Sequence, residues 1–223
     1  LMWGLSRELS KNFMIKVFAD YTENHKKFDE QASFSIERVG GIKLLRKYRK
    51  AQLVNEFIKY NKIDGIIADH WKSLELIKSS KKKFCLIHSK EINHPKGSSL
   101  NKRVLNVLNN IEKVIANSEF TKNLAIQCGV NENNIVVINP GIDLAKELDK
   151  KTMNKVESLL KVKTPRLITV SRFDKRKNHE KVIMALRNLK QIYPDITYTC
   201  IGYGDEEEKL KKLVIELKLE DQV

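Results

Sequence analysis

Four cations lie close together where a strand gives way to a helix. The β-branched run at residues 168–170 predicts a strand, and apolar residues recur at helical spacing from Val182 to Leu186. The segment between them holds Arg172, Lys175, Arg176 and Lys177. Ligands of open parallel sheets bind at the carboxyl ends of the strands, so we expect an anionic ligand at this loop.

Two histidines in the first half of the chain follow apolar runs. His88 ends the run at residues 84–88, and His70 stands in the sequence Asp-His-Trp after a second run. A histidine at the end of a strand can position or orient charge at a reacting centre, and it can equally be structural. His88 is the preferred candidate, and His70 is the alternative.

Three glycines stand where the backbone must turn. Gly202 and Gly204 begin the sequence GYGDEEEKL, which has two of the three glycines of a dinucleotide-binding fingerprint. The acidic residues 205–208 occupy the start of the next helix, where they would repel a pyrophosphate. We therefore expect close backbone approach at these glycines rather than phosphate binding by this helix, with a plain turn as the alternative. Gly141 in NPGID has the same two interpretations, a backbone approach or a simple turn.

The composition limits the class of protein. The 223 residues suggest one or two domains, and the net charge is +14. Residues 1–110 carry 22 basic and 11 acidic residues, so most of the excess lies in that half. Such a charge favours nucleic acid, an anionic membrane or phosphorylated small molecules as binding partners. It can equally reflect a solvated surface without a partner. The three cysteines show neither zinc-ligand nor disulfide spacing, which indicates a reducing, cytoplasmic location, and no apolar run could span a membrane.

The chain alternates between strand and helix patterns. Short apolar runs predict strands at residues 13–19, 63–68, 84–88, 113–116, 134–138, 167–170 and 196–201. Helical periodicity predicts helices at residues 42–60, 71–80, 98–111, 118–128, 178–192 and 205–218. Ser118, Asn178 and Asp205 are suitable N-caps, and Gly129 suits a helix end. The alternation predicts an α/β fold with parallel sheets.

Several segments together resemble the retaining glycosyltransferases of family 4. The resemblance is carried by VIANSEFTKNLAIQCGVNENNIVVINPGID, LITVSRFDKRKNHEKVIMAL and IGYGDEEEKLKKLVIELKLEDQV, and more loosely by IDGIIADHW and FCLIHS. It implies the GT-B architecture of two Rossmann-like domains. Residues 1–143 would be the acceptor-side domain without its first strand, residues 144–164 an inter-domain connection, and residues 165–223 the start of the nucleotide-sugar domain.

The resemblance also implies a reaction and its residues. A sugar would pass with retention from a nucleoside diphosphate donor to a hydroxyl acceptor, as in lipid-linked glycan, lipopolysaccharide or exopolysaccharide synthesis, without a metal or other cofactor. Arg172 and Lys177 would bind the pyrophosphate and stabilise its departure, and His88 would contact the transferred sugar. Gly141, Gly202 and Gly204 would let the backbone approach the bound donor. The family often has glycine where Asn178 stands.

Two family motifs are expected outside the chain. The glycine-rich first loop should precede residue 4, and the E-x7-E motif should lie beyond Val223. We therefore expect an internal fragment in which both domains are incomplete, and which is inactive by itself. A catalytically inactive relative that binds sugar nucleotides is an alternative to the enzyme.

A basic amphipathic helix is expected at residues 41–60. Its apolar stripe comprises Leu44, Tyr48, Ala51, Val54 and Ile58, and its cations lie mostly on the other side. Such a helix can rest on an anionic membrane, as a lipid-linked acceptor would require, or it packs on a sheet with its cations in water. A nucleic-acid-binding module is a further alternative. It is not favoured because the sequence lacks interleaved basic and aromatic residues.

Overall fold

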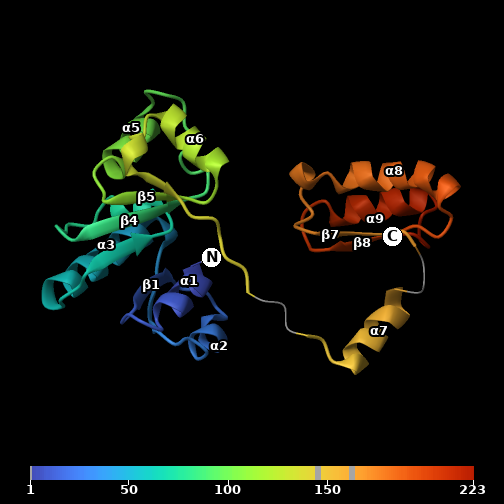
Figure 1. Ribbon diagram of the computed structural model, residues 1–223, viewed down its shortest axis with the longest axis horizontal. Helices are drawn as coiled ribbons and strands as arrows, with labels where there is room; N and C mark the ends of the chain where they lie inside the picture. The colour runs from blue at the N-terminus through green and yellow to red at the C-terminus, as the bar shows by residue number, and fades with distance from the viewer. Residues whose placement is uncertain (1, 144–146, 161–163) are drawn as a thin grey trace. The chain divides into compact units, whose positions relative to one another are not determined.

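The chain forms two compact units, residues 1–143 and 144–223, each with its own parallel strands (Figure 1). The computed structural model describes residues 2–143, 147–160 and 164–223. Every strand pair in both units is parallel, which confirms the predicted α/β class.

The first unit contains two parallel sheets. The smaller pairs β1 (Lys16–Asp20) with β2 (Ser35–Val39). The larger has the order β3-β4-β5-β6, formed by β3 (Gly65–Ala68), β4 (Lys82–Ile87), β5 (Lys113–Ala116) and β6 (Ile135–Val137). Because sequential strands are neighbours and parallel, the loops after β3, β4, β5 and β6 emerge at one edge of the sheet.

Helices of the first unit are α1 (Met2–Leu9), α2 (His25–Asp29), α3 (Lys43–Tyr60), α4 (Trp71–Leu74), α5 (Ser99–Leu108) and α6 (Glu119–Cys128). Figure 1 shows α5 and α6 over one side of the larger sheet. Their apolar faces form one core with the strands, around fully buried Ile87, Val104, Leu108, Val114 and Ala125.

Capping side chains fix where two of these helices begin. Ser98 Oγ accepts the Asn101 N–H at 3.2 Å, and Ser118 Oγ accepts the Thr121 N–H at 3.2 Å. Gly129 ends α6 in the left-handed conformation with φ of 103°. The predicted caps at Ser118 and Gly129 are therefore confirmed, because each satisfies a backbone group that the helix leaves unpaired.

The second unit contains α7 (Lys150–Leu160), β7 (Arg166–Val170), α8 (His179–Ile192), β8 (Thr197–Ile201) and α9 (Glu207–Glu216). Ile183 and Leu186 of α8 and Leu210 of α9 bury their side chains against Tyr198 of β8. Figure 1 shows both helices along the same side of β7 and β8. Ile168 and Val170 remain exposed.

All seven predicted strands are present, and the sequence interpretation missed β2. Its residues SIERV alternate apolar and polar side chains over only five positions. The helix predicted at residues 71–80 is shorter than expected, since α4 ends at Leu74. The segment expected to connect two domains, residues 144–164, contains α7, while residues 144–146 and 161–163 lie outside the described residues.

We predict that Leu108→Ala lowers the free energy of unfolding of the first unit by about 2–5 kcal/mol, because it opens a cavity in the core. Leu108 is 0% exposed, whereas Leu44 on α3 is 82% exposed. The matched variant Leu44→Ala should change the unfolding free energy by no more than about 0.5 kcal/mol. Urea titrations followed by circular dichroism measure both, and equal losses would show that this assignment of the core is wrong.

Candidate functional site

The loop between β7 and α8 is anchored to the turn after β8. The Phe173 N–H donates to the Tyr203 carbonyl at 2.9 Å, and the Phe173 carbonyl accepts the Glu206 N–H at 3.1 Å. The Phe173 ring is buried in the core of the second unit. These bonds fix the backbone of the loop at the carboxyl end of β7, where the sequence placed the clustered cations.

Within this loop, the cations differ in their pairing. Asp174 accepts the Arg176 N–H at 3.0 Å and pairs with the Arg176 guanidinium at 3.1 Å. Arg172 reaches the same carboxylate only at 3.9 Å, and its side chain is 69% exposed. Lys177 is exposed as well, and no carboxylate pairs with its ammonium among the described residues. Arg172 and Lys177 thus present charge to solvent from a fixed backbone.

Asp174 shapes the loop and moderates its charge. It stands before the short 3-10 helix η2 (Lys175–Lys177). Burial acts to raise the pKa of Asp174, but the hydrogen bond and charge of Arg176, together with the charge of Arg172, leave this pKa below its ordinary value. The carboxylate is therefore ionised at neutral pH, and it neutralises Arg176 most directly.

The prediction that the Asn178 side chain caps α8 is wrong. Asn178 precedes α8, but its side chain forms no capping hydrogen bond. Its backbone is left-handed, with φ of 58° and ψ of 32°, because it also ends η2. Asparagine and glycine are the residues that tolerate this conformation best.

Gly202 and Gly204 are required by contact with the cationic loop. A Cβ atom at Gly202 would lie 1.9 Å from the Ser171 carbonyl oxygen, and one at Gly204 would lie 2.4 Å from the Phe173 carbonyl oxygen. The expected close backbone approach therefore occurs between the two loops. Contact of these glycines with a nucleotide stays a prediction.

Asp205 is not the N-cap of α9, in contrast to the prediction. The Glu207 N–H donates to the Gly204 carbonyl at 3.1 Å, so residues 204–207 form a turn and α9 begins two residues later than Asp205. Glu207 and Glu208 occupy its first turn and both pair with Lys211, at 2.8 and 3.2 Å. Acidic side chains thus complement the positive end of the helix dipole.

His88 follows β4 directly and is half-buried. The backbone N–H of His88 donates to the side-chain carboxylate of Glu91. The next residue, Ser89, has φ of 97°, and its carbonyl accepts the N–H groups of Ile92 and Asn93 at 3.2 and 3.1 Å. A serine in this conformation is unfavourable unless the surrounding bonds impose it, and such residues concentrate at functional sites.

His70 has a structural role in this chain. Its Nδ1 accepts the Lys72 N–H at 3.0 Å and so caps α4. Burial lowers the pKa of His70, and the charge of Lys72 lowers it further despite the opposing effect of Glu91. A neutral imidazole with Nδ1 as acceptor is consistent with this cap. His88 therefore remains the preferred candidate of the two.

Hydrogen bonds order the loops after β5 and β6. Thr121 Oγ1 donates to the side-chain oxygen of Asn117 at 2.7 Å, and Asn139 Nδ2 donates to the Asn117 carbonyl at 3.3 Å. Together with the Ser118 cap, these bonds order the loops that follow both strands. Their observed contacts are structural.

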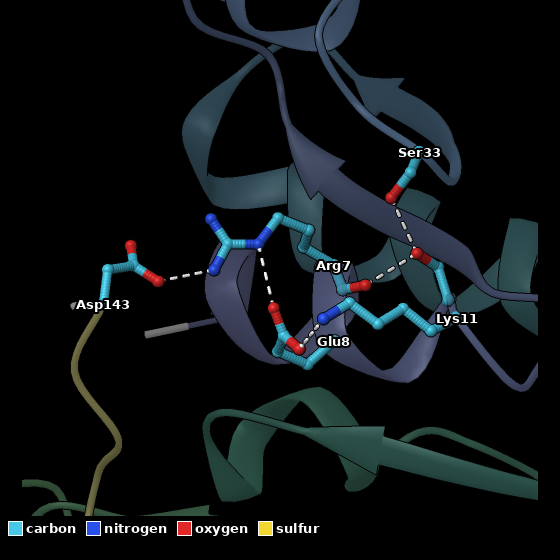
Figure 2. Close-up of polar contacts among 6 residues, drawn as sticks. Arg7, Glu8, Lys11, Ser33 and Asp143 are labelled. Atoms are coloured by element: carbon cyan, nitrogen blue, oxygen red, sulfur yellow. Dashed lines mark hydrogen bonds and ion pairs between the residues drawn. The ribbon is translucent and has the colours of Figure 1, made fainter. Parts of the chain in front are cut away.

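The NPGID segment forms no regular turn, and its end is held by α1. Arg7 on α1 pairs with Asp143 at 2.5 Å, and Figure 2 shows its guanidinium also facing Glu8. The hydrogen bond from Arg7 lowers the pKa of Asp143. Beyond its two chain neighbours, Gly141 has no atom within 4 Å of where a Cβ would lie, so the segment is open to solvent there. The donor role expected for Gly141 stays a prediction.

The apolar stripe expected at residues 41–60 divides into two parts. Ala51 is buried and Phe57 packs edge-on against Phe18 of β1, with ring centroids 5.6 Å apart. At the other end, the apolar side chains are exposed: Ile42, Leu44, Leu45 and Tyr48. The apolar stripe of α3 therefore packs on the protein only from Ala51 onward.

The predicted site residues fall into two groups. Arg172, Lys177, Gly202 and Gly204 lie in two adjoining loops of the second unit, and His88 and Gly141 belong to the first unit. The sequence interpretation missed His179 and Tyr198, which bury polar groups beneath the cationic loop. Their signal was weak because His179 lies at the start of a helical pattern and Tyr198 is in an alternating strand.

Two family profiles match almost the whole chain. Residues 2–146 match Glycosyltransferase Family 4, and residues 150–223 match Glycosyl transferases group 1. The uncharacterized glycosyltransferase MJ1069 of Methanocaldococcus jannaschii is 33% identical over 105 residues, which are 45% of this chain and 26% of that protein. The chain thus spans about a quarter of this curated relative.

Solved structures share the fold. Alr3699/HepE of Anabaena, crystallised with UDP-glucose, matches with a TM-score of 0.74 at 21% identity, covering 100% of this chain and 63% of that chain. Sucrose-phosphate synthase of Thermosynechococcus elongatus matches with a TM-score of 0.72 at 17% identity, covering 99% and 62%. At these identities the likeness shows the fold, which is that of the GT-B glycosyltransferases.

We predict that Gly202→Ala disrupts the contact between the two loops of the second unit. The added methyl group would collide with the Ser171 carbonyl, so the free energy of unfolding should fall by about 1–3 kcal/mol. Gly141→Ala is the matched control and should have an effect of no more than about 0.5 kcal/mol. Denaturant titration measures both losses, and a neutral Gly202→Ala would contradict the described loop packing.

Proposed function

The chain belongs to glycosyltransferase family 4, and from this membership we propose that it is part of an enzyme that transfers a sugar from a nucleoside diphosphate donor to a hydroxyl group, with retention of configuration. Residues 1–143 would form the acceptor side and residues 165–223 the donor side. A sugar-nucleotide-binding relative without catalysis is the second candidate.

One observation carries the donor assignment. Arg172 and Lys177 are exposed at the carboxyl end of β7, on a loop that backbone hydrogen bonds hold to the turn after β8. Fixed cations at such an edge suit a pyrophosphate. The Anabaena protein of the same fold was crystallised with UDP-glucose, which supports a nucleotide sugar as the ligand class.

The chemistry follows from the charge on the leaving group. As the bond from the sugar to the donor breaks, negative charge develops on the pyrophosphate oxygens. Arg172 and Lys177 would stabilise that charge, and their stabilisation would be stronger in the transition state than in the bound donor. His88 is proposed to contact the transferred sugar and orient it. No metal is needed in this proposal, because the two cations supply the charge.

We predict that Lys177→Ala in the full-length protein lowers turnover at least ~100-fold, the scale for losing one charge partner of a transition state. Lys175→Ala is the matched control, since it removes the same charge from the same short helix. It should retain turnover within about threefold, as expected for a screened surface charge. Transfer from a panel of nucleoside diphosphate sugars measures both, and unchanged turnover in Lys177→Ala would refute the assignment.

The exposed end of α3 favours an acceptor at a membrane. We define the apolar-basic patch as Ile42, Leu44, Leu45 and Tyr48 with the neighbouring Lys43 and Lys47. Two other cations of this helix are engaged elsewhere, because Lys50 and Arg46 pair with Asp20 at 2.6 and 3.7 Å. The Lys47 ammonium lies over the Tyr48 ring, 4.7 Å from its centroid, and apolar side chains flanked by lysines suit the surface of an anionic bilayer. No helix among the described residues could itself cross a membrane.

We predict that the chain binds vesicles of phosphatidylcholine containing about 30% phosphatidylserine more tightly than vesicles without it. Leu44→Asp should lower the partition coefficient at least about tenfold, because it places a negative charge at the bilayer surface. Tyr60→Asp, at the other end of the same helix, is the control and should bind like the wild type. Co-sedimentation measures binding, and equal effects of the two substitutions would exclude the patch.

A further inference from the structure

A buried histidine lies beneath the cationic loop. His179 is 2% exposed, and both of its ring nitrogens have partners. Nε2 lies 3.0 Å from Ser171 Oγ, and Nδ1 lies 3.0 Å from the Tyr198 hydroxyl oxygen. The Phe173 ring packs edge-on against the imidazole, with centroids 5.1 Å apart. A buried ring with these contacts is fixed in position and orientation.

The contacts of His179 continue into the sheet. The Tyr198 hydroxyl donates to Thr169 Oγ1 at 3.0 Å, so its oxygen accepts the Nδ1–H of His179. Burial raises the pKa of Tyr198, which keeps this hydroxyl protonated as a donor. A continuous set of side-chain bonds therefore links β7 and β8 to the first residue of α8.

The same histidine joins the two ends of the loop. Ser171 directly precedes Arg172, and His179 follows Lys177 with only Asn178 between them. The contact between Ser171 and His179 therefore closes the segment 172–178 at its base. Asn178 holds the left-handed turn that brings these ends together. The exposed cations lie within this closed segment.

We propose that His179 is a positioning residue that holds Arg172 and Lys177 in place for the pyrophosphate, without touching the donor itself. The inference rests on the proposed function, since it assigns a role within the same donor site. This role differs from simple packing in the core, because each contact of the ring has its own effect. The contact with Tyr198 anchors the ring to the sheet, and the contact with Ser171 holds the two ends of the loop together. Preorganised charge is worth more than mobile charge, because no ordering cost is incurred on binding.

Three substitutions separate these contacts. His179→Ala removes both. His179→Asn places its amide near the position of Nδ1, so it retains a partner for Tyr198 and loses the contact with Ser171. His179→Gln reaches the position of Nε2 and restores the contact with Ser171. If His179 holds the loop, Ala and Asn should behave alike and Gln should resemble the wild type.

Two measurements on the whole chain test whether the three variants differ in this way. Hydrogen exchange at the Phe173 and Lys177 amides, which bond to Tyr203 and Asp174, reports on the loop itself. Calorimetric titration with inorganic pyrophosphate reports on binding without depending on the nucleotide base. We expect His179→Ala and His179→Asn to speed exchange at both amides and weaken pyrophosphate binding at least about tenfold. His179→Gln should stay within about threefold of the wild type.

Leu186→Ala is the matched control for lost stability. Leu186 is fully buried on the same helix, about two turns after His179 and without a polar contact to the loop, so its truncation should destabilise the unit without these changes. The inference is overturned if His179→Ala leaves exchange at the loop amides unchanged, or if Leu186→Ala and His179→Gln reproduce its effects. If the wild type binds no pyrophosphate, the proposed function fails, while the exchange data still decide whether His179 holds the loop.

Discussion

The hydrogen bonds between the 171–173 segment and the turn after β8 are the constraint on which the donor site depends. The Ser171 N–H continues the sheet by donating to Ile201 at 3.0 Å, and Phe173 then exchanges two bonds with the 203–206 turn. Because Gly202 and Gly204 let these backbones approach, the base of the loop is fixed by backbone hydrogen bonds that use neither the Arg172 nor the Lys177 side chain. Arg172 and Lys177 can therefore stay exposed while their backbone is held.

Unusual backbone conformations accompany both predicted groups of site residues. Ser89 and Asn178, each with positive φ, are direct neighbours of His88 and Lys177. In both cases hydrogen bonds of the surrounding loop impose the conformation: Ser89 accepts two backbone N–H groups, and Asn178 connects η2 to α8. The two units thus use the same device, in which a turn at the carboxyl end of a strand fixes the residue beside it.

The sequence predicted most helices and strands and the position of the clustered cations. It could not predict the backbone conformation and the buried contacts that hold those cations in place. Apolar runs and helical periodicity located seven strands, and the spacing after residues 168–170 located Arg172 and Lys177. Pattern alone could not show that Asn178 is left-handed rather than a side-chain cap, because asparagine is suited to both roles. The burial of His179 and Tyr198 depends on contacts from β7, β8 and the loop together, which no local pattern contains. Likewise, the pattern of α3 predicted one continuous apolar stripe, although its apolar side chains pack in the fold only from Ala51 onward.

Residue-specific NMR of the charged groups tests the central claim most directly, which is that the fixed cations of this loop bind the pyrophosphate of the donor. Inorganic pyrophosphate would be titrated into the isotopically labelled chain while the Arg172 Nε and Lys177 Nζ signals are followed. We expect saturable shifts at these two groups, well before signals of other exposed lysines such as Lys43 respond. Shifts spread evenly over the surface lysines, or confined to the basic first unit, would contradict it.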